Sequence, residues 1–337
     1  MFAFFGTVLS AAVVSALSYW AASAGYIFPL TWIECLAMGA LISATDPVSV
    51  LAIMKDSQAD KTLYNIIFGE SVFNDAAAIV LYATILKIDR GTPDFGTIIS
   101  SFFTCVWIFF GSILIGSSIG MLVSFLLKSV SLKNRRNFEA SAVIFGPWIT
   151  YLVSEACDLS GIVSILFCGI FMAHYTYPNL SPGSRKVVGR NYEAVAEACE
   201  LLVFIFLGMG LFSFNLPYEK TGWKTIVLCS SFILLARLVL VVVCTVLVNP
   251  WRTHKISCKA LLFMWFAGLR GAIAFALAIQ SVDDFKNGEV ILTVTTVFAV
   301  VSVVLGGSFV NSLLHCLGLF QQADGESPLR RGAPRIH

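Results

Sequence analysis

The sequence has few charged residues. Asp, Glu, Lys and Arg make up only 12% of its 337 residues, whereas an ordinary soluble domain is about one quarter charged. Hydrophobic residues account for 58% of the chain, and the mean hydropathy is +0.85. This composition excludes an ordinary water-soluble domain.

Three further features are missing. The net charge is only +2, and no block of basic residues is interleaved with aromatics, so a nucleic-acid-binding surface is not expected. The nine cysteines form no CxxC pair, which excludes a zinc site or a disulfide framework. The first apolar stretch, Met1 to about Ala24, lacks a positive n-region and is too long for a signal peptide. We interpret it as a membrane-spanning helix.

Apolar stretches of about 20 residues recur along nearly the whole chain, and a helix of that length crosses the hydrocarbon core of a bilayer. We therefore predict an all-α polytopic membrane protein with about ten spans. The predicted spans are 2–24, 33–54, 62–87, 98–127, 139–155, 159–177, 196–214, 224–248, 258–281 and 289–316. Residues 318–337 are expected to form a short tail.

The distribution of lysine and arginine predicts the orientation, because cytoplasmic loops carry an excess of both. The loops after the second, fourth, sixth and eighth predicted spans contain twelve of these residues. The loops on the opposite side contain five. Both termini, and with them the tail, are therefore expected in the cytosol.

Two predicted spans are interrupted, the second at Thr45–Pro47 and the ninth at Gly268–Gly271. Each is the middle helix of a three-helix group, 1–90 and 223–317, and the four spans between the groups give them opposite topology. Proline and glycine can merely kink a helix, but here both interruptions also carry a charge. Broken helices at matching places of an inverted repeat indicate a transporter site, so the two groups are predicted to be the halves of an ion-transport core.

Ionisable residues inside the membrane are functional candidates, because a charge at the bilayer centre costs at least about 2.5–3.5 kcal/mol. Few residues qualify. They are Asp46, Glu70, Asp75, Glu200, Arg237 and Arg270.

Asp75 is the predicted carrier. On the third span, Glu70 and Asn74 are stacked at i, i+4, whereas Asp75 is turned by about 100° from Asn74. Asp75 is followed by the small residues Ala76–Ala78, which allow another helix to approach closely. The alternative is that Asp75 belongs to a structural ion pair.

A carboxylate kept out of water favours its protonated form, whereas a bound cation favours the ionised form. One buried aspartate therefore holds either a proton or an alkali ion, and this competition is an exchange mechanism. Hard cations prefer oxygen ligands, which Asp75, Asn74, Asp46, Thr45 and unwound carbonyl groups would supply. We expect a transporter rather than an enzyme, with Na⁺ or K⁺ and H⁺ as substrates and no cofactor.

The remaining charges are predicted to be structural. Glu70 needs a permanent partner, and Arg237 is the only mid-span cation outside a break, so we predict a Glu70–Arg237 pair. Arg270 lies between glycines at the second break. There its guanidinium would satisfy freed carbonyl groups or balance the negative ends of half-helices.

At these residues the sequence resembles the eukaryotic sodium/proton exchangers of the monovalent cation–proton antiporter superfamily. The resemblance covers nearly the whole chain and is carried by Ala44–Val48, by Phe68–Ser71 with Asn74 and Asp75, and by Gly268–Phe275. Phe167–Ile170, Ala173–Tyr177 and Asn179–Ser181 look most like the intracellular branch. This similarity implies an endosomal or Golgi membrane, with the plasma membrane as the alternative.

The resemblance also implies roles. Asp75 would carry cation and proton, Asn74 and Asp46 would support the site, and Ser160 would help to ligate the ion. Exchange would be electroneutral, because an asparagine precedes the carrier aspartate. Residues 91–222 would contain a linker helix and dimer or scaffold spans, and the core would move against a dimerisation domain of a homodimer.

Two alternatives remain. Members of this family usually have thirteen spans and a long tail, and the first three spans and most of the tail have no counterpart here. A truncated, non-transporting remnant is therefore one alternative. An intramembrane aspartyl protease would use Asp46 and Asp75, but its GxGD stretch is missing, since Phe73–Asn74 precede Asp75.

Overall fold

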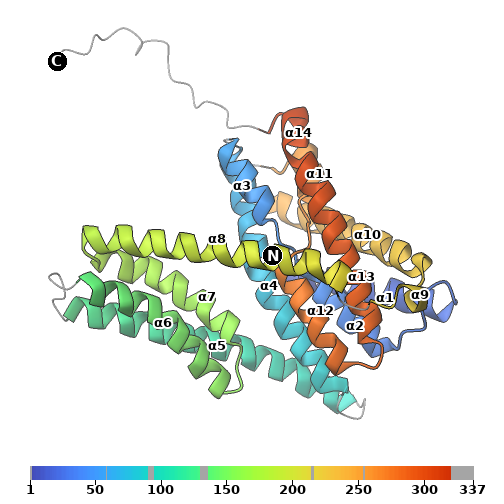
Figure 1. Ribbon diagram of the computed structural model, residues 1–337, viewed down its shortest axis with the longest axis horizontal. Coiled ribbons are helices and arrows are strands. Elements are labelled where there is room, and N and C mark those ends of the chain that lie inside the picture. Colours follow the sequence, from blue (N-terminus) through green and yellow to red (C-terminus); the bar gives the residue numbers. More distant parts are fainter. Residues whose placement is uncertain are drawn as a thin grey trace, which may run out of the picture. The chain divides into compact units, whose positions relative to one another are not determined.

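The computed structural model describes residues 2–57, 59–89, 95–129, 136–213, 216–252 and 255–319 (Figure 1). These residues are almost entirely helical, which confirms the predicted all-α class. The chain separates into two compact units, one of Met1–Asp75 with Leu216–His337 and one of Ala76–Asn215. The first unit contains residues of both predicted three-helix groups, and the division between the units falls between Asp75 and Ala76, within one helix.

Among the described residues, the first unit contains the beginning of α4 (Lys61–Asp89) and nine further α-helices. These are α1 (Phe4–Ser23), α2 (Trp32–Ser43), α3 (Val48–Asp56), α9 (Tyr218–Thr221), α10 (Trp223–Val248), α11 (Cys258–Phe266), α12 (Ala272–Asp284), α13 (Gly288–Val301) and α14 (Gly307–Leu317). A short 3₁₀-helix, η3 (Asn249–Trp251), follows α10, and a π-helical turn, η4 (Ser302–Gly306), joins α13 to α14. The second unit contains the rest of α4, α5 (Phe95–Ser129), α6 (Arg136–Ala156), α7 (Gly161–Phe171), η1 (Met172–Thr176), η2 (Tyr177–Asn179) and α8 (Pro182–Ser213).

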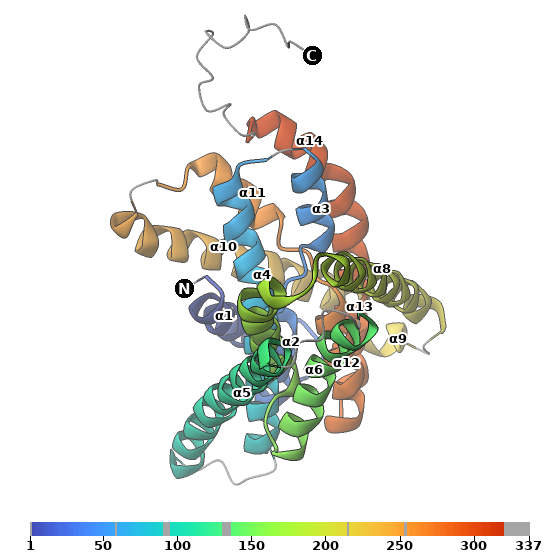
Figure 2. The same cartoon turned by 90° about the vertical axis from the view of Figure 1, so that its left-hand side faces the viewer.

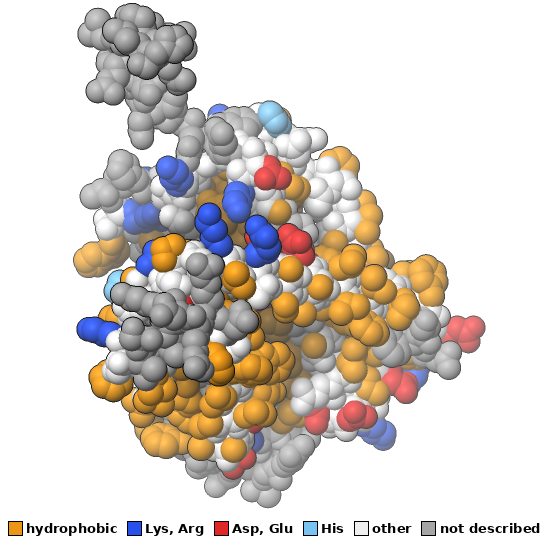
Figure 3. All heavy atoms as spheres, turned by 60° about the vertical axis from the view of Figure 1, so that its left-hand side comes forward, with side chains coloured by type: hydrophobic (Ala, Val, Ile, Leu, Met, Phe, Trp, Pro, Cys, Tyr) orange, Lys and Arg blue, Asp and Glu red, His pale blue; other side chains and the backbone are white. Residues whose placement is uncertain are grey.

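Eight helices of the described part are long and apolar enough to cross a membrane. They are Phe4–Ser23, Trp32–Asp56, Lys61–Ile88, Phe103–Ser129, Gly161–Asn179, Pro182–Phe212, Trp223–Trp251 and Gly288–Leu317. Hydrophobic side chains also cover much of the visible surface, as lipid contact requires (Figure 3). The chain is a multi-pass membrane protein.

The predicted count of about ten spans is not confirmed. The two remaining predicted spans fall on α6 and on α11 with α12. Helix α6 contains Glu139, Glu155 and an internal Pro147, which lower its apolar character. Helices α11 and α12 are separated by the second break, so neither is long enough alone.

The predicted cytosolic tail and several charges used for the orientation lie outside the described residues. These include residues 320–337 and the loop residues Arg90, Lys133 and Arg135. The orientation of the termini therefore stays a prediction.

Within the first unit, α1 packs against α2 and α10, and α12 packs against α2 and α13. An apolar core joins α3, α4, α10, α11 and α14 through buried side chains such as Val50, Leu63, Val241, Phe263 and Leu314. Helices α3, α11 and α14 lie close together in both ribbon views (Figures 1 and 2). This packing supports the half-helices that flank the two breaks.

The two breaks meet inside the first unit. Helix α2 ends at Ser43 and α3 begins at Val48, because Pro47 lacks an amide hydrogen and disfavours helical geometry in the residue before it. The amide of Asp46 donates to the carbonyl oxygen of Leu269 at 2.9 Å. At Gly271, a Cβ atom would overlap the carboxylate of Asp46, so only glycine permits this approach. The prediction of two broken helices that cross is confirmed.

In the second unit, α5, α6 and α7 pack side by side, and α8 packs against α6 (Figure 1). Helix α8 begins at Pro182, well before the predicted span at 196–214. The N-terminal part of α8 contains Arg185, Lys186, Arg190 and Glu193. These charged residues explain why this part was not included in the predicted apolar span, but they are compatible with a helix.

Candidate functional site

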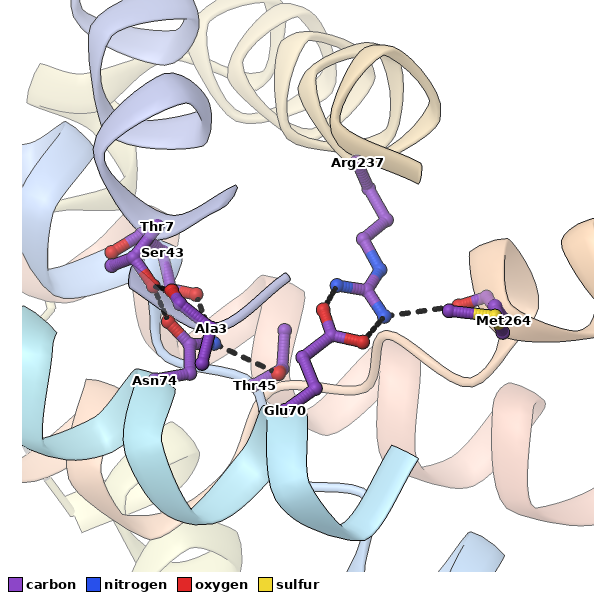
Figure 4. A network of polar contacts seen from close by, with 8 residues as sticks. All are labelled: Ala3, Thr7, Ser43, Thr45, Glu70, Asn74, Arg237 and Met264. Atoms are coloured by element: carbon purple, nitrogen blue, oxygen red, sulfur yellow. Dashed lines mark hydrogen bonds and ion pairs between the residues drawn. The ribbon is translucent and has the colours of Figure 1, made fainter. Parts of the chain in front are cut away.

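Asn74 on α4 fixes the end of α2 (Figure 4). Its Nδ2 donates hydrogen bonds to the carbonyl oxygen of Ser43 at 2.8 Å and to Oγ1 of Thr45 at 2.9 Å. Its Oδ1 accepts a hydrogen bond from the hydroxyl group of Thr7 on α1. Because the amide uses both its donor and its acceptor within the protein, Asn74 positions the first break.

Thr7 was not anticipated from the sequence. It is buried on α1, where it contacts both Asn74 and the carbonyl oxygen of Ala3. The signal that could have revealed it is the row of buried hydroxyl residues on the same side of α1, which includes Ser10, Ser15 and Ser18. Such small polar residues mark the packed face of a membrane helix.

Asp46 holds the starts of two half-helices. Its Oδ1 accepts from the amide of Val48 at 3.3 Å, and its Oδ2 accepts from the amide of Ala272 at 3.4 Å. These are the first residues of α3 and α12. A carboxylate at a helix N-terminus satisfies orphan amide groups and is favoured by the helix dipole, and here one carboxylate serves two helices.

Asp75 has a different environment from the other carboxylates. Its Oδ1 is buried and has no hydrogen-bond partner, and it is the one carboxylate oxygen among the described residues in that state. Asp75 interacts electrostatically with Asp46 and with Arg270. A buried oxygen without a partner costs free energy until it is protonated or binds a cation.

The structure brings Glu70 and Arg237 together in a buried ion pair (Figure 4). Nη1 of Arg237 contacts Oε1 of Glu70, and Nη2 donates to Oε2 at 3.2 Å. Nη2 also donates to the carbonyl oxygen of Met264 at 3.0 Å. Since Met264 lies in the last turn of α11, Arg237 also supports the helix end that precedes the second break.

Arg270 is 1% exposed, and its Nε and Nη1 atoms have no hydrogen-bond partner. The expectation that its guanidinium satisfies freed carbonyl groups is thus not met at these two atoms. Its backbone amide donates to Oγ of Ser302 at 3.3 Å, and its charge interacts with those of Glu70, Asp75 and Arg237. Arg270 is a buried positive charge within reach of the carboxylates.

Two further predicted residues belong to the second unit. Ser160 is the N-cap of α7, where Oγ accepts from the amide of Val163 at 3.4 Å and the Ser160 amide donates to Oγ of Ser112 at 3.0 Å. The N-cap role at the start of α7 is therefore enough to explain a serine at position 160. Glu200 lies within α8.

The charges at the two breaks and on the facing parts of α4 and α10 nearly cancel. Asp46, Glu70 and Asp75 contribute three negative charges when ionised, and Arg237 and Arg270 contribute two positive ones. The centre therefore carries one uncompensated negative charge. One proton or one monovalent cation neutralises it.

Comparison with known proteins gives a consistent result. The family model described as "Sodium/hydrogen exchanger, transmembrane" matches residues 1–316. Sodium/hydrogen exchanger 5 of Arabidopsis thaliana is 39% identical over 94% of this chain and 61% of its own length. Sodium/hydrogen exchanger 8 of Homo sapiens is 34% identical over 95% of this chain and 55% of its own length. The chain thus spans between half and two thirds of the length of these relatives.

Among solved structures, the sodium proton antiporter MjNhaP1 from Methanocaldococcus jannaschii at pH 8 has a similar fold. The TM-score is 0.71 at 18% sequence identity, and the match covers 93% of this chain and 77% of the antiporter. At this identity the likeness establishes the fold.

Proposed function

Since this chain belongs to the sodium/hydrogen exchanger family, we propose that it exchanges Na⁺ or K⁺ for H⁺ across a membrane and that Asp75 is the carrier. The observation that supports this assignment is the buried Oδ1 of Asp75, which has no hydrogen-bond partner. The other carboxylates near the breaks are engaged. Glu70 is paired with Arg237, and Asp46 accepts from two helix N-termini.

Exchange follows from competition for one carboxylate. A cation or a proton binds Asp75, but both together would leave the centre with an excess positive charge. Because the charges of Asp46, Glu70, Asp75, Arg237 and Arg270 sum to minus one when Asp75 is ionised, either substrate makes this centre neutral and able to cross an apolar barrier. This balance supports electroneutral exchange of one cation for one proton.

The surrounding residues take supporting roles in this proposal. Asn74 keeps the unwound stretch after α2 in place, so that Thr45 and the free carbonyl groups remain near the carrier. Asp46 joins the two half-helices at the crossing and adds negative charge that favours a cation. Ser160 is included as a further oxygen ligand on the basis of the family resemblance.

We also propose a cellular setting. The resemblance of residues 167–181 to the intracellular exchangers favours a Golgi or endosomal membrane, where cation entry in return for protons would raise the luminal pH. The excess of Lys and Arg in alternate loops favours cytosolic termini. A homodimer, with the second unit contributing the scaffold, follows from the same resemblance.

The test is cation-dependent pH change in proteoliposomes that contain the purified chain. We expect Na⁺- or K⁺-driven proton movement with the wild-type chain, loss of at least 90% of the rate (about tenfold) in Asp75→Asn, and near wild-type rates in Asp56→Asn. Asp56 is the matched control, because it is an exposed aspartate at the end of α3. Full activity in Asp75→Asn would exclude Asp75 as the carrier, and an inactive wild-type chain would contradict exchange by this chain.

A further inference from the structure

The second unit contains an apolar groove that the exchange site does not use. It lies between α6, the α7–η1 segment and α8 and has a volume of about 350 Å³, within the range typical of small-molecule sites. The side chains of Val143, Pro147, Met172, Leu180 and Val188 contribute to its walls. Its lining is almost free of polar groups, so its occupant must be largely apolar.

Two glycines keep the groove open. Gly169 on α7 and Gly189 on α8 both line it, and a Cβ atom at either position would meet no other atom within 4 Å. Neither glycine has a positive φ angle, so a larger residue is compatible with the backbone at both positions. A larger side chain at either position can therefore fill the free space in the groove.

One edge of the groove carries a fixed positive charge. Nε of Arg185 donates to the carbonyl oxygen of Leu180 at 3.1 Å, and Nη2 donates to that of Pro178 at 2.6 Å. The guanidinium also lies over the ring of Tyr177, 5.4 Å from its centroid. Since Leu180 and Tyr177 line the groove, Arg185 is held beside it in one orientation.

The helical spacing of α8 turns Arg185 toward the groove. Arg185, Val188, Gly189 and Tyr192 recur at i, i+3, i+4 and i+7, and the last three line the groove. Arg190 lies on another side of the helix, turned by about 140° from Arg185.

A residue in the wall of the groove has a buried hydroxyl group without a partner. Thr176 lines the groove and is 1% exposed, and its Oγ1 has no hydrogen-bond partner. It lies in η1, a π-helical turn, and such turns occur frequently at functional sites. A ligand with one acceptor oxygen next to an apolar chain would satisfy this hydroxyl.

We propose that the groove binds an anionic glycerophospholipid. One acyl chain fills the apolar part, an ester oxygen accepts from Thr176, and the phosphate pairs with Arg185. Basic pockets between membrane helices bind anionic lipid head groups, and the cytosolic leaflet, where the orientation prediction puts this end of α8, is rich in such lipids. The carboxylate of Glu139 on α6 is buried and accepts hydrogen bonds from Ser181 and Ser184.

The test measures lipid binding rather than transport, so it is independent of the proposed exchange. The thermal stability of the purified chain in detergent is followed during titration with phosphatidylglycerol, with phosphatidylcholine and with inorganic phosphate alone. A ligand that binds the folded state raises the melting temperature in a saturable way. We expect saturation with phosphatidylglycerol, at least tenfold weaker binding of phosphatidylcholine, and no effect of phosphate at the same concentrations.

Matched variants locate the site. Gly189→Leu and Gly169→Leu fill the groove, and Arg185→Gln removes its charge; each is expected to weaken phosphatidylglycerol binding at least tenfold. Gly208→Leu on α8, which also has open space around it, and Arg190→Gln are expected to bind like the wild type. A melting curve recorded without lipid identifies any variant that fails to fold. If one of the two groove-filling leucine variants does not fold, the other one still tests the groove. Wild-type binding by folded groove variants, or equal losses in the control variants, would overturn the proposal.

Discussion

Glu70 and Asp75 lie on the same helix, and their partners give them different tasks. Both carboxylate oxygens of Glu70 accept hydrogen bonds from Arg237, which also donates to the carbonyl oxygen of Met264. Glu70 is therefore committed to this ion pair. Asp75 keeps a buried oxygen without a partner, which is why we propose it as the group whose charge changes during exchange.

The ion pair gives the first prediction. Glu70→Gln leaves the Arg237 charge buried without compensation, and removal of one partner of a buried pair typically destabilises a protein by about 3–5 kcal/mol. Chemical unfolding in detergent should report a loss of this order. The double exchange Glu70→Arg with Arg237→Glu should recover part of it.

An exposed pair in the same unit serves as the control. Lys220 and Glu289 are 3.9 Å apart, with about half of each side chain exposed, and such pairs contribute about 0–1 kcal/mol. Glu289→Gln should therefore change stability by less than about 1 kcal/mol. A loss as large as that of Glu70→Gln would mean that burial is not what makes the Glu70 pair important. A double exchange that recovers nothing would argue against direct pairing.

At the scale of elements, the site depends on two interrupted helices that touch at their breaks. The amide of Asp46 donates to the carbonyl oxygen of Leu269, and the Asp46 carboxylate accepts from the first amide of α12. Each break thus satisfies backbone groups of the other, which an apolar membrane interior demands. Gly271 is the residue that permits this contact.

Gly271→Ala tests the crossing directly. The added methyl group would overlap the Asp46 carboxylate, so we expect at least a tenfold loss of exchange rate together with a lower melting temperature. Gly307→Ala at the start of α14 is the matched control, because a Cβ atom there meets nothing within 4 Å. It should leave transport unchanged and alter stability by no more than about 1 kcal/mol. Normal exchange by Gly271→Ala would show that the close contact is dispensable.

The sequence predicted the breaks but not the contacts between them. Pro47, Gly268 and Gly271 interrupt apolar stretches, and both interruptions appear where they were expected. Thr7 and the carbonyl group of Met264 could not be predicted as partners, because such contacts depend on how helices rotate and cross. In the described part of the chain, eight helices qualify as spans by length and hydropathy. The charges and proline of α6, and the division of α11 from α12, prevent the same conclusion for the other two predicted spans.

At the scale of the whole molecule, the charge balance limits what each step of the proposed exchange can move. The centre has one uncompensated negative charge when Asp75 is ionised. One bound proton or one bound alkali ion removes it, and the loaded centre is neutral in both cases. A cycle that carries one cation one way and one proton the other way therefore moves no net charge.

This balance predicts that exchange is insensitive to membrane potential. If one net charge crossed per cycle, 100 mV would bias the cycle by about 2.3 kcal/mol, or about 40–50-fold in the equilibrium gradient. We expect Na⁺-driven pH change in proteoliposomes to be the same with and without a thiocyanate diffusion potential. Asp75→Asn vesicles under the same potential provide the background leak. A potential-dependent equilibrium would contradict one-for-one exchange and, with it, the proposal that either one proton or one cation neutralises the centre.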